Sequence, residues 1–211
     1  GLNNWGRIPS WDCVQISISP NLPQHAGRTI GALAAERGQD PIDTVADYLV
    51  DDKGATRVLV TSISEADISD IVRSKIALVG SDGNCVATYG TVSQGMPHPR
   101  FYGAFPRIIG RYVAEQGLLP LEFAIHKMTG ATAQALKFRD RGLLREGYRA
   151  DVTIFDPADF KDRASYADPH QYPTGRRTAV IVNGTIVVEN AAHTGALPGA
   201  VLRRDRAGRV G

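Results

Sequence analysis

The sequence is poor in cysteine, in charge of one sign and in long apolar runs, and each shortage excludes a class of protein. Its two cysteines, Cys13 and Cys85, cannot form a disulfide framework or a cysteine-based metal cluster, and they suit a reducing compartment such as the cytoplasm. A net charge of +2 gives no reason to expect a nucleic-acid partner. No apolar run approaches the roughly 20 residues of a membrane span, so no membrane contact is expected.

The remaining composition is that of a globular protein. Hydrophobic residues make up 43% of the 211 residues, which is enough for one core or for a core with a small second unit. Arg203, Arg204, Arg206 and Arg209 form the only basic cluster, and we expect a frayed, solvated tail there. The chain opens with Gly1 and shows no signal peptide, which we interpret as a trimmed domain or a fragment of a longer protein.

The first part of the sequence alternates strand-like with helix-like segments, which predicts an α/β fold. Its clearest helix follows Asp40, because an aspartate N-cap precedes Pro41 at the first helical position. The apolar positions of this helix form one stripe: Ile42, Val45, Ala46, Leu49 and Val50. Strands are expected over residues 13–19, 56–63 and 75–80, and helices over 29–37, 41–50 and 64–72.

The character of the sequence changes near Gly142. We expect residues 1–140 to form the α/β part and residues 141–211 to form a small β part. In the second part, Asn183-Gly184 stands between two arms rich in valine and isoleucine, which predicts a β-hairpin with a type I′ turn. Before this hairpin, helices are expected over residues 106–116, 121–128 and 132–138, and a strand over residues 150–156.

Asp82 is the main candidate functional residue. It follows Lys75–Gly80, a continuously apolar segment that predicts a strand covered on both faces of a parallel sheet. Reactive groups of such folds lie where the strands end, and a carboxylate there can ligate a metal or act as a general base. The alternative from the residues alone is a loop cap, in which Asp82 accepts hydrogen bonds from nearby amides.

Further candidates lie on either side of this loop. Arg100 can be a planar fork for a carboxylate, with an ordinary surface arginine as the alternative. His98, held near it by Pro99, can reach a metal, contact a substrate or simply close the loop. Ser81 has no nearby histidine in the sequence, which gives no support to a serine-hydrolase triad, but it remains a candidate substrate contact beside Asp82.

Four segments, taken in order, resemble a known family. They are "GSDG", "HPRFYGAFPRIIGRYV", "HKMTGATAQALKFRDRGLLREGYRADVTIFDP" and "VIVNGTIVVEN". Together they resemble the carboxyl-terminal part of the amidohydrolase superfamily, and most closely the D-aminoacylases, also called N-acyl-D-amino-acid deacylases. The "HPR…FPR" run is the most specific element, whereas the motif from Gly142 to Asp151 is general to amidohydrolases. The resemblance covers the chain from about Trp11 to about Arg203.

This resemblance implies the carboxyl-terminal part of a metal-dependent (β/α)₈ barrel with strands of a small β-sandwich domain. It implies zinc as the cofactor and hydrolysis of the amide bond of N-acyl-D-amino acids, which gives a carboxylate and a free D-amino acid. In this family Asp82 would end the last barrel strand, lie at the metal and assist the attacking hydroxide. Arg100 would bind the α-carboxylate of the substrate, with Ser81 and His98 as further substrate contacts.

The same resemblance exposes what the sequence does not contain. The other metal ligands of the family would lie upstream, so the missing amino-terminal part of the same barrel is an expected partner; a full barrel takes about 250 residues. The segment Gly83–Pro97 is longer than the family leads us to expect. Two alternatives stay open: another zinc amidohydrolase, such as a dihydroorotase-like or hydantoinase-like cyclic amidase, and a non-catalytic fragment that acts as a scaffold.

Overall fold

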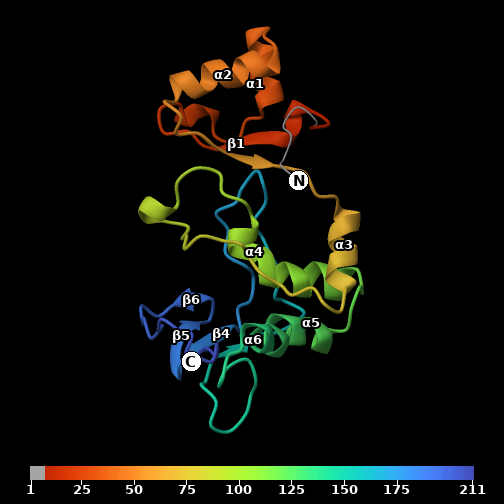
Figure 1. The fold of residues 1–211 in the computed structure, drawn as a ribbon, viewed down its shortest axis with the longest axis vertical. Helices are drawn as coiled ribbons and strands as arrows, with labels where there is room; N and C mark the ends of the chain where they lie inside the picture. Colours follow the sequence, from red (N-terminus) through yellow and green to blue (C-terminus); the bar gives the residue numbers. More distant parts are fainter. Residues whose placement is uncertain (1–7) are drawn as a thin grey trace. The chain divides into compact units, whose positions relative to one another are not determined.

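The computed structural model describes residues 8–211, which fold as a mixed α/β chain in two compact units (Figure 1). None of the described helices is long and apolar enough to span a membrane. Of the described residues, the first unit comprises residues 8–65, Asp82–Tyr102 and Ala164–Tyr172, and the second comprises Ala66–Ser81, Gly103–Arg163 and Pro173–Gly211.

The first unit is built on a two-stranded sheet with two helices beside it (Figure 1). Strand β1 (Val14–Ile18) pairs with β2 (Arg57–Val60), and both lie within the segments predicted as strands. The two strands pair antiparallel, not parallel. Residues 8–211 add three short helical turns to this unit, η2 (Trp11–Cys13), η3 (Pro23–His25) and η4 (Gly90–Val92).

The two helices of this unit begin and end where their capping residues predict. Helix α1 (Ile30–Arg37) ends at Gly38, whose φ of +63° is a left-handed conformation that glycine adopts without a Cβ clash. Helix α2 (Pro41–Asp51) begins after Asp40, whose side chain accepts a hydrogen bond from the amide of Ile42. Local capping chemistry therefore fixed both boundaries.

The core of the first unit joins β1 to both helices. It consists of Val14, Ile16, Ile30, Leu33 and Tyr48. The apolar stripe expected to mark the inner face of α2 is mostly exposed, with Ile42 62% and Val50 77% accessible. Among the described residues, α2 instead buries the face that carries Thr44 and Tyr48, whose hydroxyl donates to the Ser19 hydroxyl at 2.9 Å.

Asp52, directly after α2, is the buried polar anchor of this unit. Its carboxylate is fully buried and accepts hydrogen bonds from the Asn21 amide at 2.8 Å and the Thr56 hydroxyl at 2.5 Å. Burial alone would raise the pKa of the Asp52 carboxyl, but these donors favour the charged form more strongly, so its pKa lies below the usual value. The ionised carboxylate is thus part of the folded state.

Replacing Asp52 with alanine should lower the free energy of unfolding at pH 7 by ~1–3 kcal/mol, because buried donors lose their acceptor. A depressed pKa contributes stability above the ordinary aspartate value of about 3.9 and loses it as the pH falls further. In urea unfolding curves the difference between parent and variant should therefore stay constant from pH 7 to about pH 4 and shrink as the pH falls further. Asp47→Ala, on the exposed face of α2, is the control, and an Asp52 difference that does not change with pH contradicts this account.

The second unit contains a helical layer. Its helices are α3 (Glu65–Arg73), the end of α4 (Arg100–Arg107), the π-helix η5 (Ile108–Glu115), α5 (Leu121–Met128) and α6 (Gly130–Leu136). The prediction that Pro106 opens a helix was wrong, because the helix already begins at Arg100 and Pro106 lies inside it. Proline cannot donate the hydrogen bond of a regular turn, and a wider π-helix follows directly.

The core of this helical layer is continuous. Its buried members are Val72, Ile108, Ile109, Tyr112, Leu119 and Ala124. Lys127 on α5 is also buried, and its ammonium donates to the carbonyls of Val72 at 2.5 Å and Ser74 at 2.8 Å. Burial lowers the pKa of Lys127. Its ammonium supplies hydrogen-bond donors to two carbonyl groups at the end of α3.

The predicted hairpin is confirmed in the small sheet of the second unit. Strands β3 (Val152–Ile154), β4 (Ala179–Val182), β5 (Thr185–Glu189) and β6 (Ala192–His193) pair antiparallel in that order. Asn183 and Gly184 both have positive φ, +47° and +80°, as a type I′ turn between β4 and β5 requires.

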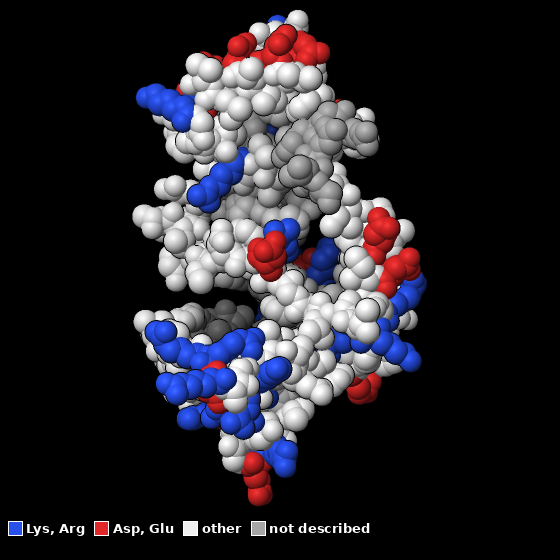
Figure 2. Space-filling view, viewed as in Figure 1, with Lys and Arg blue, Asp and Glu red and all other residues white. Residues whose placement is uncertain are grey.

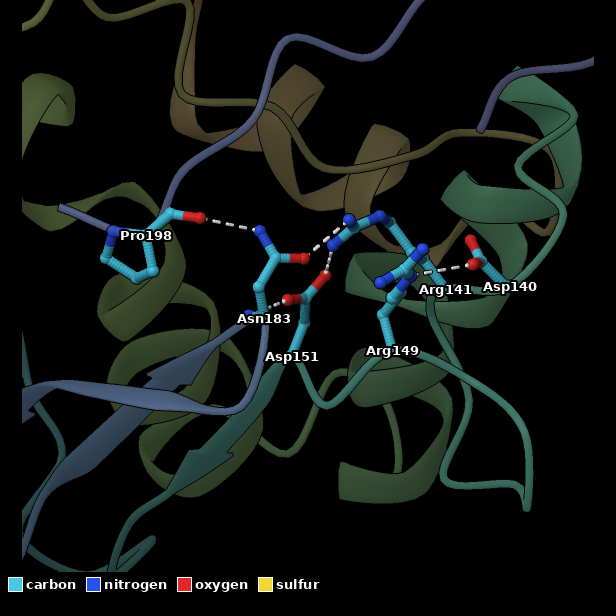
Figure 3. Close-up of polar contacts among 6 residues, drawn as sticks. All are labelled: Asp140, Arg141, Arg149, Asp151, Asn183 and Pro198. Carbon is cyan, nitrogen blue, oxygen red and sulfur yellow. Dashed lines mark hydrogen bonds and ion pairs between the residues drawn. The ribbon is translucent and has the colours of Figure 1, made fainter.

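The motif from Gly142 to Asp151 ties this hairpin turn to the preceding loop (Figure 3). Arg141 donates to the carboxylate of Asp151 and, at 2.6 Å, to the side-chain oxygen of Asn183. The backbone amide of Asn183 donates to Asp151 at 2.9 Å, and its side-chain amide donates to the carbonyl of Pro198 at 2.7 Å. Gly142 has a φ of +84° and no room for a Cβ beside Ala133. The motif is therefore a structural joint within the second unit.

Two expectations, one for an apolar strand and one for the basic tail, were wrong. Lys75–Gly80 forms no strand, and Ile76 is 93% exposed, because the described residues provide no neighbouring strand for it. The basic tail is not frayed, since Val210 is 5% exposed and its backbone bonds both Lys137 and Arg139. Figure 2 shows Lys and Arg side chains gathered over the part of the second unit that carries the small sheet.

Candidate functional site

Asp82 lies in the first unit in an uncommon backbone conformation. Its φ is +46°, a left-handed value that aspartate and asparagine tolerate better than most residues. Its side chain is 86% exposed, so the carboxylate is available to react or to bind. Ser81 belongs to the second unit, and its proposed part in substrate binding stays a prediction.

Arg100 contacts Asp82 directly, so the structure brings together the two main candidates from the sequence. A terminal nitrogen of the guanidinium donates to a carboxylate oxygen of Asp82 at 2.6 Å, although the residues are 18 positions apart. The guanidinium has five N–H donors, and this bond uses one. Among residues 8–211, the buried Nε of Arg100 has no hydrogen-bond partner. The guanidinium therefore has N–H donors beyond the one that binds Asp82.

His98 holds the backbone of Arg100 rather than joining a set of metal ligands. Its Nδ1 accepts a hydrogen bond from the Arg100 amide at 3.0 Å, at the first residue of α4. Its Nε2 lies 3.0 Å from the hydroxyl of Tyr166, which comes from the distant loop after residue 157. No signal in the sequence points to this tyrosine, because no periodicity or short motif relates two residues 68 positions apart.

The loop between Asp82 and Arg100 is fastened to the rest of the first unit. Met96 exchanges two hydrogen bonds with Ser17, at 2.7 and 2.8 Å. His170, which has no obvious role in the sequence, places Nε2 2.8 Å from the Gly95 carbonyl and Nδ1 3.1 Å from the hydroxyl of Tyr102. Burial raises the pKa of the Tyr102 hydroxyl, which keeps it protonated. These contacts give a long loop a defined path.

The residues that the structure describes do not form a complete metal site by themselves. Across residues 8–211, no group of three or more histidine, cysteine, aspartate or glutamate side chains comes together to hold one. Asp82 supplies a single carboxylate, whereas a catalytic zinc usually takes three protein ligands. Cys85 is exposed and free. The described residues thus form a carboxylate–guanidinium pair on a fastened loop, and no complete metal centre.

Comparison with known proteins identifies the family of this chain. Residues 15–188 match the model of a family described as "Amidohydrolase family". The chain belongs to the amidohydrolase family. The resemblance seen in the sequence is confirmed, and Asp82 and Arg100 both lie inside the amidohydrolase match.

Two curated relatives of this amidohydrolase chain come from Alcaligenes xylosoxydans xylosoxydans. A D-aminoacylase is 37% identical over 186 residues, which cover 88% of this chain and 36% of the relative. An N-acyl-D-aspartate deacylase is 38% identical over 187 residues, which cover 89% of this chain and 35% of the relative. The chain therefore spans about a third of the length of the curated relatives it matches.

Solved amidohydrolase structures share this fold. A crystal structure of D-aminoacylase matches with a TM-score of 0.75 and 33% identity, over 87% of this chain and 36% of that one. The N-acyl-D-glutamate deacylase of Bordetella bronchiseptica, complexed with zinc and a phosphonate inhibitor, matches with a TM-score of 0.72 and 33% identity, over 86% and 36%. At this identity the likeness supports a shared fold and a shared family.

Proposed function

We propose that this chain is the carboxyl-terminal portion of an N-acyl-D-amino-acid deacylase. The reaction is hydrolysis of the amide bond of an N-acyl-D-amino acid, which releases a carboxylate and the free D-amino acid. Support comes from the relatives, which are named as D-aminoacylase and as deacylases of N-acyl-D-aspartate and N-acyl-D-glutamate. A cytoplasmic location belongs to the same proposal and agrees with two free cysteines.

The contact between Arg100 and Asp82 is the observation that carries this proposal. An N-acyl amino acid has one fixed charge, the α-carboxylate, and a single carbon atom separates that group from the amide nitrogen. An Arg100 fork that binds the α-carboxylate therefore holds the scissile amide close to the carboxylate 2.6 Å from the same fork. A site with this spacing suits N-acyl amino acids better than neutral amides.

The two side chains have separate tasks in this proposal. Arg100 binds and orients the substrate through its unused N–H donors. Asp82 takes a proton from the attacking water and returns it to the departing amine nitrogen, so the C–N bond breaks and a neutral amine leaves. Its exposure leaves the carboxylate accessible to water and substrate while it accepts the bond from Arg100.

Zinc and the complete barrel are the parts of the proposal that this chain cannot provide alone. The neighbouring N-acyl-D-glutamate deacylase structure contains zinc, and a second D-aminoacylase structure is described as having a binuclear metal center. When bound, zinc would supply an acidified water as the nucleophile. Asp82 would be at most one of its ligands, with the rest in the amino-terminal part of the same (β/α)₈ barrel. The strands β3–β6 would belong to the small β-sandwich.

Stereochemistry tests this proposal. The full-length protein should hydrolyse an N-acetyl-D-amino acid, and the L-enantiomer should react at least about ten times more slowly. With the α-carboxylate on the fork and the amide beside Asp82, inversion at Cα exchanges the side chain and the hydrogen, so the L side chain must occupy the place of the D hydrogen. The measurement is release of the free amino acid from each enantiomer, followed by chiral chromatography. Equal rates on both enantiomers, or hydrolysis of neither, would contradict the proposed substrate class.

A further inference from the structure

We propose that Tyr166 is a positioning residue for carboxylate recognition, and that it acts on Arg100 through the ring of His98. This inference rests on the proposed function, because it concerns how the substrate-binding fork is aimed. It also changes the expected role of His98 from a direct substrate contact to a support for Arg100. All three residues lie in the first unit.

A chain of three polar contacts links Tyr166 to Asp82. The Tyr166 hydroxyl lies 3.0 Å from Nε2 of His98, and the two rings meet edge to face with centroids 5.1 Å apart. Nδ1 of His98 accepts the Arg100 amide at 3.0 Å. The guanidinium of Arg100 then donates to Asp82 at 2.6 Å. In this series of contacts, each residue positions the next.

The hydrogen-bond roles allow one tautomer of neutral His98. Because Nδ1 accepts the proton of the Arg100 amide, it carries none of its own, and the ring proton is on Nε2. Nε2 therefore donates to the Tyr166 oxygen. A ring turned by half a rotation would place carbon atoms at both partners. The tyrosine hydroxyl thus selects the ring orientation in which Nδ1 faces Arg100.

The His98 ring in turn fixes where the Arg100 side chain starts. Its acceptor satisfies the first amide of α4, as an asparagine N-cap would. The same turn is closed by the Phe101 amide on the His98 carbonyl at 3.0 Å and the Tyr102 amide on the Pro99 carbonyl at 3.1 Å. The Cα of Arg100 is thus held at one end of the side chain, and the bond to Asp82 at 2.6 Å holds the guanidinium at the other.

Loss of the Tyr166 hydroxyl should leave the Arg100 guanidinium in place but less precisely positioned. Tyr166→Phe keeps the edge-to-face packing but removes the contact between the Tyr166 hydroxyl and Nε2 of His98. We expect kcat/KM for an N-acetyl-D-amino acid to fall about 3- to 10-fold, the size expected from one hydrogen bond. The matched N-acetyl amine has no carboxylate for Arg100, so its kcat/KM should change less than 2-fold.

The test compares five variants of the full-length protein on both substrates. They are Tyr166→Phe, His98→Ala, His98→Asn, the double variant Tyr166→Phe with His98→Asn, and the control Tyr148→Phe. Asparagine can still accept the Arg100 amide but is too short to reach Tyr166. His98→Asn should therefore retain several-fold more acid-substrate activity than His98→Ala. In the His98→Asn background, the added Tyr166→Phe change should have no further effect.

A Tyr166→Phe loss that is equal in the parent and in the His98→Asn background, or equal on acid and amine substrates, would overturn the inference. An unchanged acid preference in His98→Ala would overturn it as well. These outcomes differ from failure of the proposed function, in which Arg100→Lys itself shows no preferential loss on the acid substrate. Tyr148 lies in the second unit and takes no part in this chain of contacts, so its variant should match the parent on both substrates.

Discussion

Replacing Asp82 with asparagine should lower kcat of the full-length protein by about 10²–10⁴-fold, the usual range for a positioned general base. An amide cannot take the proton of an attacking water, so the chemical step loses its base. The fold should survive, because asparagine tolerates the left-handed conformation that Asp82 adopts at a φ of +46°. Its side-chain oxygen can also still accept the hydrogen bond of Arg100.

The matched control for this change is Asp43→Asn. Asp43 is an exposed aspartate of the same unit, in the first turn of α2 and away from the loop that carries the candidate site. Steady-state kinetics and a thermal unfolding curve should be recorded for both variants. An Asp82→Asn variant with more than half of the parental turnover would refute the assignment of Asp82 as the base.

Replacing Arg100 with lysine should raise the barrier reported by kcat/KM for N-acetyl-D-amino acids by about 2–4 kcal/mol, the range for disrupting a charge pair that the bound substrate has desolvated. Lysine keeps the charge, but its ammonium is a point donor and cannot grip both oxygens of a carboxylate as a planar fork does. The lost orientation should lower kcat as well as weaken binding. Arg100→Lys therefore separates fork geometry from simple charge.

Arg28→Lys is the matched control for Arg100→Lys. Arg28 belongs to the same unit and is paired with the carboxylate of Glu36, and its side chain is 34% exposed against 40% for Arg100. Exposed pairs of this kind contribute little to stability, about 0–1 kcal/mol. We expect Arg28→Lys to retain the parental kcat/KM within 2-fold, which would show that the Arg100 effect is specific to the site.

Local chemistry made several elements predictable from the sequence. The start of α2 followed from Asp40 and Pro41, and the hairpin turn followed from Asn183-Gly184, because each depends on the conformations that a few adjacent residues allow. The choice of Asp82 and Arg100 as candidates rested on resemblance to a family, since spacing alone left a loop cap and a surface arginine as alternatives, and their contact is seen only in the structure.

Features that depend on distant partners could not be predicted. An apolar run such as Lys75–Gly80 indicates burial but does not say which strand covers it, and the described residues contain no such strand. The stripe on α2 likewise marked an apolar face that the first unit leaves largely exposed. Tyr166 reaches His98 from another loop, and Lys127 reaches the end of α3 from another helix, so neither contact follows from the sequence.

The most direct test of the central claim is the ratio of kcat/KM for an N-acetyl-D-amino acid to that for the matched N-acetyl amine. The two substrates share the scissile amide and side chain and differ only in the α-carboxylate. The account predicts a strong preference for the acid in the full-length parent and in Arg28→Lys, and loss of most of that preference in Arg100→Lys. Equal losses on acid and amine in Arg100→Lys would contradict it, because Arg100 would then support the loop rather than bind the substrate.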